Sequence, residues 1–467
     1  MTGAGFKRAL SPFDATMVVV GGIIGAGIFI NPYIVAERLP SAGWVLAAWA
    51  VGGAIALAGS LAYAELGSLF PRAGGQYVYL REAYHPVVGF LYGWALMLLI
   101  ECGAIAAVAI TFAQYALRLA GRSDAGALPL AVAAIVVVSA INYLGVKPGS
   151  RVLNVLVVLK VAALVVLIGA GFLLAPAGPE AAGAGTAAVE GAASASAARP
   201  AGASGPLLVL FGAALIPILF SYGGWQNANY VAEEIADARR NLPRSLLAGT
   251  LLVVVVYVLV NVVYLRALGL EGLAATRTPA SDAAARFLGP AGDRFVAAAI
   301  AISTFGFLDL AVLAPTRVYY AMAADGLFFR GVARLHPRYR TPSLAIGLQA
   351  VWSIALMLTG TYAALIDTVV FADWIFFGLT VGSVLVFRRR IPLASREPGG
   401  FRAPFHPILP VLFALVSAGV VASVVLSNPV RSAVGAALLL AGIPAFLYWR
   451  RRAPSPAEEE NGRGERE

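Results

Sequence analysis

Long apolar segments dominate this chain and constrain its fold more than any other feature. Twelve runs of mostly apolar residues follow one another, each about 20 residues or longer, which is enough to cross roughly 30 Å of hydrocarbon as a helix. The runs do not alternate as strands do, and backbone groups in lipid must be hydrogen-bonded within a helix or a closed barrel. The sequence therefore predicts an all-α integral membrane protein. The predicted helices cover 14–37, 43–67, 87–118, 127–146, 152–175, 206–232, 245–268, 293–324, 343–361, 364–387, 408–427 and 432–449.

The composition excludes a water-soluble fold. Only 12% of the 467 residues are charged and 60% are hydrophobic, whereas about 25% of the residues of an average soluble domain are charged. Lys7 and Arg8 precede the first run, as in a secretory signal. That run is longer than the apolar core of a signal peptide, however, and a second span follows at once. We therefore expect the first helix to be retained.

The net charge of +10 follows a membrane topology. With the N-terminus in the cytoplasm, 24 of the 34 basic residues fall in cytoplasmic segments, nine fall outside, and Lys160 is left within a span. The positive-inside rule then predicts that both termini are cytoplasmic. We expect a multi-pass protein of the plasma membrane, which in a bacterium is the inner membrane. Because the basic residues do not form one patch, no nucleic-acid partner is expected.

Two of the predicted helices are interrupted, about 200 residues apart. The first run contains Gly21, Gly22, Gly25 and Gly27, and each glycine weakens a helix by about 1 kcal/mol relative to alanine. The sixth run contains a second interruption at 220–225. Glycine-broken apolar segments at corresponding positions of two halves are typical of inverted-repeat transporters, which bind their substrate near the bilayer midplane.

Unwinding such helices leaves backbone groups without partners in a region that water does not reach. The N–H groups near Gly25, Gly27 and Ile28 would suit an anion, and the carbonyls in 220–223 would suit an ammonium. The backbone of an amino acid carries both groups on one carbon. Two alternatives remain for the glycines: Gly21 and Gly25 have the spacing of a helix-packing motif, and Gly-x-Gly occurs in dinucleotide loops. The dinucleotide loop lacks its strand–turn–helix context here.

Further motifs follow in a fixed order and spacing. They occupy 21–29, 63–66, 71–77, 220–225, 233–234, 240–243, 303–306, 317–326 and 336–342. With these motifs the chain, over about residues 10–390, resembles the amino acid–polyamine–organocation (APC) superfamily of permeases, and within it bacterial relatives of the L-type amino acid transporter branch. The resemblance implies the leucine-transporter fold, in which helices 1–5 and 6–10 form a 5+5 inverted repeat and two further helices are peripheral.

This fold sets the expected organisation of the chain. The first five-helix repeat would occupy 13–175 and the second 206–390. The other expected segments are a cytoplasmic N-terminus at 1–12, a flexible external loop at 176–205, two peripheral helices within 391–452 and a disordered cytoplasmic tail at 453–467.

The resemblance also implies a substrate site. The backbone around Ile23, Gly25 and Gly27 would bind the substrate α-carboxylate, and the carbonyls of 220–223 would bind its α-ammonium. Phe220 matches an aromatic gate over the substrate, with ordinary helix packing as the alternative. The predicted substrate-binding residues are Ile23, Gly25, Gly27, Ile28, Phe220, Ser221, Gly223, Gln226 and Tyr257.

Lys160 lies in the middle of an apolar run, where a lysine costs at least about 2.5 kcal/mol to insert. The resemblance places its ammonium where sodium-coupled members of the fold bind a sodium ion, bridging helices 1 and 8 with Gly21, Ser303 and Thr304 as neighbours. A fixed cation at this position implies sodium-independent transport. The alternative is a structural lysine paired with a carboxylate such as Glu101 or Asp309.

Several other polar residues lie within predicted spans. Tyr257, Asn261 and Tyr264 fall on one face of the seventh helix. The resemblance places Tyr257 between the substrate and Lys160, whereas interhelical hydrogen bonds are expected for the other two. Glu101 and Asp309 depart from the family pattern, and each is interpreted either as a proton site or as a member of a structural ion pair.

Enzyme, pump and sensor functions are not favoured. The three histidines, His85, His336 and His406, lack the spacing of metal ligands, so no metal site is expected. No Walker motif is present, no cofactor is expected, and there is no space for a soluble signalling domain.

In the mammalian L-type branch, a cysteine after the third helix bonds a glycoprotein heavy chain. Residues 119–127 contain no cysteine, so no disulfide-linked heavy chain is expected. The sequence thus predicts a sodium-independent secondary transporter that exchanges neutral amino acids by alternating access. Proton-coupled symport of amino acids or amines is the alternative.

Overall fold

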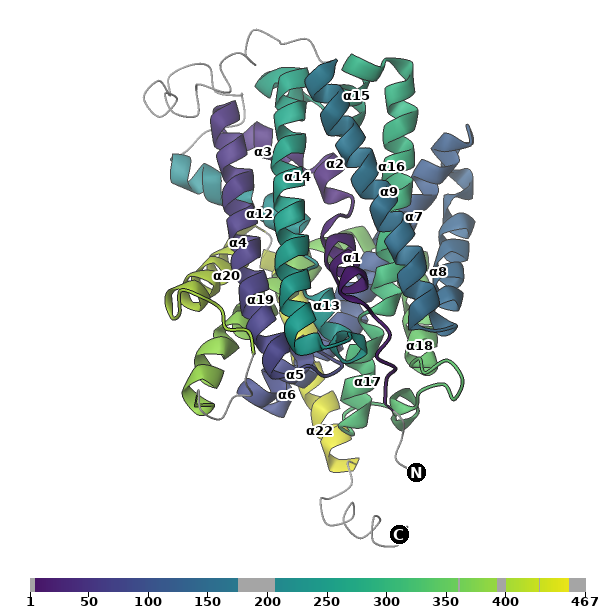
Figure 1. Cartoon of the computed structure of the whole chain (residues 1–467), viewed down its shortest axis with the longest axis vertical. Helices are drawn as coiled ribbons and strands as arrows, with labels where there is room; N and C mark the ends of the chain where they lie inside the picture. Colours follow the sequence, from purple (N-terminus) through teal and green to yellow (C-terminus); the bar gives the residue numbers. More distant parts are fainter. Residues whose placement is uncertain (1–4, 175–205, 360–361, 393–399, 428, 453–467) are drawn as a thin grey trace, which may run out of the picture.

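The computed structural model of the chain is a bundle of helices, many of which run along its long axis (Figure 1). It describes residues 5–174, 206–359, 362–392, 400–427 and 429–452, with only the backbone described within 362–370. The segments at 176–205 and 453–467, for which a loop and a tail were predicted, lie outside the described residues. Within the described ranges the only β-type pairing is an isolated bridge between Leu10 and Ile235, so the predicted all-α class is confirmed.

Nine helices in the described part of the chain are long and apolar enough to cross a membrane. Three shorter apolar helices, Pro12–Ile23, Leu207–Tyr222 and Ser343–Leu358, lie within the predicted runs 14–37, 206–232 and 343–361. The first two are short because the helix stops at the predicted interruption.

The first part of the chain forms helices as far as residue 173. They are α1 (Pro12–Ile23), α2 (Gly27–Ile30), α3 (Pro32–Arg38), α4 (Ala42–Leu69), α5 (Gln76–Ala83), α6 (Pro86–Ala95), the π-helix η1 (Leu96–Ile100), α7 (Glu101–Leu119), the 3-10 helix η2 (Asp124–Gly126), α8 (Ala127–Tyr143) and α9 (Val146–Leu173).

The second part begins at residue 207. Its helices are α12 (Leu207–Tyr222), α13 (Asn227–Tyr230), η3 (Ala232–Glu234), α14 (Ala238–Ala275), α15 (Pro279–Leu288), α16 (Pro290–Leu313), α17 (Thr316–Ala324), η4 (Arg330–Ala333), α18 (Ser343–Leu358), α19 (Tyr362–Arg390), α20 (Ile408–Ser427), α21 (Pro429–Leu440) and α22 (Gly442–Arg452).

The helix α1 lies at the centre of the bundle (Figure 1). It packs against α14, α9 and α16, and α4 packs along α14 while α7 packs along α16. All the side chains of α1 from Val18 to Ile23 are buried. This central position is why a break in α1 opens into the interior of the protein and not toward lipid.

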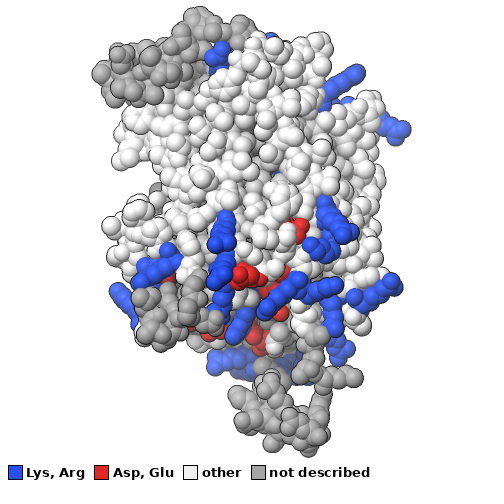
Figure 2. All heavy atoms as spheres, in the orientation of Figure 1, with Lys and Arg blue, Asp and Glu red and all other residues white. Residues whose placement is uncertain are grey.

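Charged side chains are unevenly distributed over the surface. Figure 2 shows that, on the face in view, most Lys and Arg side chains lie toward the end that carries both chain termini, whereas the middle of the molecule is almost free of charge. An uncharged middle is the surface that a hydrocarbon layer requires. The basic end is the one for which the sequence predicts a cytoplasmic location.

Candidate functional site

The first half of the site is the end of α1. This helix starts with a capping box, in which the Ser11 hydroxyl accepts from the Asp14 N–H and the Asp14 carboxylate accepts from the Ser11 N–H. It stops at Ile23, because Ile24 has an extended conformation with ψ of 94°. The chain becomes helical again only at Gly27. The glycine-rich segment predicted to break the first span is therefore unwound.

The second half of the site is the end of α12. This helix contains Pro217 and ends at Tyr222, where Gly223 is extended. Gly224 has a φ of +116°, a conformation that side chains with a Cβ rarely adopt. The predicted interruption of the sixth run is therefore also present, and α13 continues the chain after it.

The two interrupted helices touch one another through their backbones. A Cβ on Gly22 would lie 2.4 Å from the carbonyl oxygen of Gly224, and a Cβ on Gly27 would lie 2.7 Å from Oγ of Ser221. Asn31 adds a hydrogen bond from its Nδ2 to the same Ser221 oxygen, at 2.9 Å. Only glycine allows this crossing, which brings the two breaks together in space although they are far apart in the sequence.

A cavity of about 270 Å³ lies at this crossing. Its volume is near the lower end of the range for ligand pockets, about 300–1,000 Å³, so it suits a small molecule. Of the predicted site residues, the cavity is lined by Ile23, Gly25, Gly27, Glu101, Phe220, Ser221, Gly223 and Gln226. Its wall is completed mainly by apolar side chains of η1, α7, α16 and α19.

Ile28 and Tyr257, which were also predicted to bind substrate, do not line the cavity. Ile28 is fully buried behind it. Tyr257 donates a hydrogen bond from its hydroxyl to the carbonyl of Ile23, at 3.0 Å, so it contacts a cavity residue and not the cavity. Direct substrate contact by these two side chains is not supported by this geometry.

The unwound segments offer hydrogen-bonding groups of both kinds. Within the described part of the chain, no carbonyl acceptor is found for the N–H groups of Ala26, Gly27 and Ile28, whereas the Gly25 N–H donates to the Ile23 carbonyl at 3.0 Å. The last carbonyls of α12, up to Gly223, face the other side of the crossing. A small molecule with an anionic and a cationic group could bond to both sets.

Lys160 projects from α9 to the break in α1. Its ammonium donates to the carbonyls of Gly21 at 3.0 Å and Ile24 at 2.6 Å, and the residue is fully buried. Among the described residues these carbonyls, and no carboxylate, are its hydrogen-bond partners, so pairing with Glu101 or Asp309 is wrong. The charge is compensated by the carbonyl dipoles at the end of a broken helix.

Ser303 and Thr304 differ in what they contact. The Ser303 hydroxyl lies 3.3 Å from the Ile24 carbonyl oxygen that also accepts from Lys160, and 3.2 Å from that of Gly25. The Thr304 hydroxyl instead donates to Ile300 within its own helix, at 2.7 Å. A threonine in a helix commonly bonds back to the preceding turn in this way. The link from Lys160 to α16 therefore passes through Ser303 alone.

The polar stripe on α14 does not make the predicted interhelical bonds. Asn261 donates to the carbonyl of Tyr257 in its own helix, at 2.8 Å, and the buried hydroxyl of Tyr264 has no partner among the described residues. The prediction that this face points inward is correct, since all three side chains are buried. The bonds differ because the neighbouring helices present apolar side chains to Asn261 and Tyr264.

The comparison with known proteins identifies the family. Residues 10–448 match the family described as "Amino acid permease". The chain belongs to this amino acid permease family. The permease is 29% identical to "Large neutral amino acids transporter small subunit 2" of Homo sapiens, over 96% of its own chain and 82% of the relative. It is 28% identical to "Serine/threonine exchanger SteT" of Bacillus subtilis, over 97% and 99% of the two chains.

A third relative is "Asc-type amino acid transporter 1" of Homo sapiens, 28% identical over 95% of the permease and 83% of the relative. All of these proteins are named as transporters, which supports the prediction that the permease is not an enzyme. Within the described residues, no group of three His, Cys, Asp or Glu side chains could hold a metal ion.

The two carboxylates that the sequence left unplaced lie in different surroundings. Asp309 is fully buried between α8 and α16 of the permease, where Asn142 donates to its Oδ1 at 2.7 Å. Glu101 lines the cavity. Sequence reasoning missed a third carboxylate, Asp373 of α19, which also lines it. An acidic residue inside the apolar run 364–387 was the available signal.

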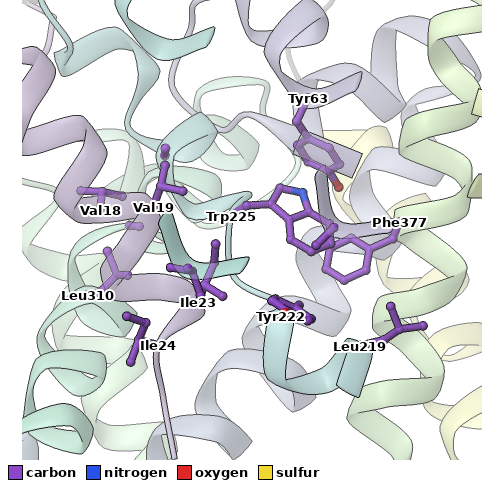
Figure 3. Close-up of a cluster of buried hydrophobic side chains, with 14 of the residues drawn as sticks. Val18, Val19, Ile23, Ile24, Tyr63, Leu219, Tyr222, Trp225, Leu310 and Phe377 are labelled. Atoms are coloured by element: carbon purple, nitrogen blue, oxygen red, sulfur yellow. The ribbon is translucent and has the colours of Figure 1, made fainter. Parts of the chain in front are cut away.

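One end of the permease is closed by aromatic rings. Phe377 lines the cavity, and the Trp225 ring stacks on it with the ring centres 5.4 Å apart. Tyr63 packs edge-on against Trp225, with the ring centres 6.3 Å apart. Figure 3 shows these rings next to Leu219 and Tyr222 at the end of α12. They separate the cavity from the end that carries the termini.

Buried ion pairs reinforce this closure. Arg388 of α19 donates from Nε to Glu65 of α4 at 2.9 Å, and both side chains are less than 10% exposed. Arg317 of α17 donates to Glu234 of η3 at 2.7 Å, and both are 1% exposed. On the cavity's other side, Phe220 is 50% exposed, so the cavity can be reached from there.

Proposed function

We propose that this permease is a sodium-independent secondary transporter that exchanges neutral amino acids across the membrane by alternating access. One observation carries the proposal: two broken helices cross at the cavity and present free N–H groups on one side and free carbonyls on the other. The backbone of an amino acid complements both. The names of the relatives, which include a neutral amino acid transporter and a serine/threonine exchanger, support the same substrate class.

In this proposal the α-carboxylate binds the N–H groups of the unwound segment around Gly25, Gly27 and Ile28, and the α-ammonium binds the carbonyls of Phe220, Ser221 and Gly223. Gln226 then faces the substrate side chain; its Oε1 also accepts from the Gly224 N–H at 3.0 Å. Tyr257 supports the site indirectly, because its hydroxyl holds the Ile23 carbonyl.

Lys160 accounts for sodium independence. Its ammonium already satisfies the carbonyls of Gly21 and Ile24, with Ser303 sharing the second. A sodium ion would need the same carbonyl oxygens as ligands. The protein's own cation therefore fills the position that a coupling ion would otherwise occupy.

The finer architecture is proposed on the same basis. Twelve transmembrane helices, arranged as a 5+5 inverted repeat at 13–175 and 206–390 with two peripheral helices, explain why helices at corresponding places pack together. Thus α4 contacts α14, α7 contacts α16, and the end of α1 meets the end of α12. With both termini cytoplasmic, the basic end in Figure 2 faces the cytoplasm.

This orientation gives the described conformation a meaning in the transport cycle. The end closed by aromatic rings and ion pairs is cytoplasmic, and the side of the cavity at Phe220 is open to the outside. Phe220 is then positioned to close over a bound substrate. Opening the cytoplasmic end requires the Glu65–Arg388 pair to separate as the broken helices move.

We further propose that the permease works in the plasma membrane without a disulfide-linked heavy chain. Its single cysteine is Cys102. That residue is buried in α7, where a partner's cysteine does not reach it.

Proteoliposomes that contain the full-length protein test this function. Uptake of labelled leucine, serine and alanine is measured with and without internal amino acid, a sodium gradient or a pH gradient. We expect uptake that requires internal amino acid and ignores sodium. Uptake into empty vesicles driven by a proton gradient would replace exchange by symport, and strict sodium dependence would contradict the role of Lys160.

A further inference from the structure

Two carboxylates line the part of the cavity that is formed by neither broken helix. Glu101 is the first residue of α7 and directly follows the π-helix η1, and Asp373 lies on α19. The two helices pack against one another. Each carboxylate acts electrostatically on the other, so they are close in space. The cavity therefore has a negatively charged wall.

No protein cation balances this wall. Within the described part of the chain, neither Glu101 nor Asp373 has a hydrogen-bond or ion-pair partner, although Glu101 is only 8% exposed. The buried cations nearest in the fold are engaged elsewhere, Lys160 with carbonyls of α1, Arg317 with Glu234 and Arg388 with Glu65. An unpaired carboxylate becomes more costly when a ligand displaces its water, unless the ligand brings a positive charge.

The rest of the wall fits a side chain that is apolar along its length and charged at its end. Leu96 and Ile100 of η1 and the rings of Trp374 and Phe377 line the cavity beside the two carboxylates. The methylene stem of lysine or arginine packs well on such surfaces, and a cation also gains from a nearby aromatic face.

We propose that Glu101 and Asp373 form a side-chain subsite for the cationic end of a dibasic amino acid, so that the permease accepts lysine- or arginine-like substrates as well as neutral ones. The inference rests on the proposed function, because the broken helices must hold the amino acid backbone for its side chain to reach this wall. It names two specificity-determining residues that the sequence motifs did not reveal.

The test compares substrates that differ in charge and hardly in shape. Proteoliposomes with the full-length protein are loaded with labelled leucine, and its release is measured on adding arginine or citrulline, and lysine or norleucine, outside. We expect each cationic member to reach half-maximal release at a concentration about tenfold or more below its neutral partner, because a site built around buried charge rejects an uncharged analogue.

Glu101→Gln and Asp373→Asn should each reduce this preference about tenfold or more, and the double variant should abolish it. Glu271→Gln, which removes an exposed carboxylate on α14, is the matched control and should keep the parental preference. Because the readout is a ratio of two substrates in one preparation, a variant that only lowers the amount of folded protein leaves it unchanged.

Three results would overturn the subsite. The parent protein could prefer citrulline and norleucine, or the two variants could retain the preference for arginine and lysine. Alternatively, release could depend on external pH without discriminating charge, which would assign the carboxylates to a proton. If no amino acid of either kind releases leucine, the proposed exchange itself fails.

Discussion

The ammonium nitrogen of Lys160 lies 2.6 Å from the carbonyl oxygen of Ile24, the residue at which α1 stops being a helix. A second bond, to Gly21, spans the last turn before the break. The side chain of one helix thus completes the hydrogen bonding of another at the point where that helix unwinds. This makes Lys160 part of the support of the site and not only a charge near it.

Replacing Lys160 with methionine should disable transport. Methionine has a similar length but donates no hydrogen bond, and each buried acceptor left without a donor costs about 1–3 kcal/mol. We expect the initial rate of amino acid exchange in proteoliposomes to fall about tenfold or more. Adding sodium should not restore it, because the methionine side chain still fills the position.

Lys7→Met is the control for this variant, because it removes an exposed lysine near the N-terminus. Its exchange rate should match the parent. A Lys160→Met protein that exchanges at the parental rate while remaining folded in detergent would contradict the role given to this residue.

Gly224→Ala should damage both stability and transport. A Cβ at this position would lie 2.1 Å from the Gly22 carbonyl oxygen, and the residue has a φ of +116°. Strain of this kind costs about 1–3 kcal/mol before the clash is counted. We expect a lower unfolding temperature in detergent together with a loss of exchange, because α1 and α13 must move apart.

Gly212→Ala provides the comparison on α12, since a Cβ there meets no atom within 4 Å. In a helix this change gains up to about 1 kcal/mol. Its unfolding temperature should stay level or rise. Equal behaviour of the two glycine variants would mean that the backbone crossing is not under steric constraint.

Glu65→Gln should destabilise the closed cytoplasmic end. Arg388 is 7% exposed and would lose its carboxylate partner. Breaking one side of a buried ion pair costs about 3–5 kcal/mol. We expect a clear fall in the free energy of unfolding, measured by denaturant titration in detergent micelles, and partial recovery in the Glu65→Leu, Arg388→Met double variant.

The exposed Glu82 offers a matched change, because it also pairs with an arginine, Arg81, but at the surface. Glu82→Gln should alter the free energy of unfolding by about 1 kcal/mol or less. If Glu65→Gln were equally mild, the buried pair would not hold the cytoplasmic end closed.

Phe220→Ala should weaken substrate binding. The ring is half exposed at the open side of the cavity, where it can close over a ligand. Losing such a ring contact costs about 0.5–1.5 kcal/mol beyond the lost area, so the half-saturating concentration of substrate should rise about fivefold to tenfold. Phe220→Tyr should keep most of the affinity.

Leu208→Ala tests whether any truncation on α12 has the same effect, because Leu208 is 84% exposed and lies at the other end of this helix. It should leave the half-saturating concentration near the parental value. An unchanged value in Phe220→Ala would remove Phe220 from the site.

The sequence predicted the helical class and both helix breaks because these depend on local properties. Apolar length decides that a segment is a membrane helix, and clustered glycines weaken it at a definite place. The crossing of the two breaks follows from the resemblance and not from any local pattern. It required Gly22 and Gly224 to be recognised as contacting positions.

Side-chain partners could not be predicted in this way. Nothing in the local sequence tells that Thr304 bonds within α16 while Ser303, its neighbour, reaches the break in α1. The direction of a side chain about its helix decides this. The same holds for Asp309 and Glu101, two acidic residues in apolar runs, of which only Glu101 lines the cavity.

The position of Glu101 depends on the five-residue π-helix η1 that ends immediately before it. A π-turn contains an extra residue relative to an α-turn, and each residue of an α-helix rotates the chain by about 100°. Deleting one residue from 96–100 would therefore turn Glu101 away from the cavity and bring a neighbour in its place. The charge of this cavity can thus change in evolution through a single codon deletion, without any substitution at the acidic residue.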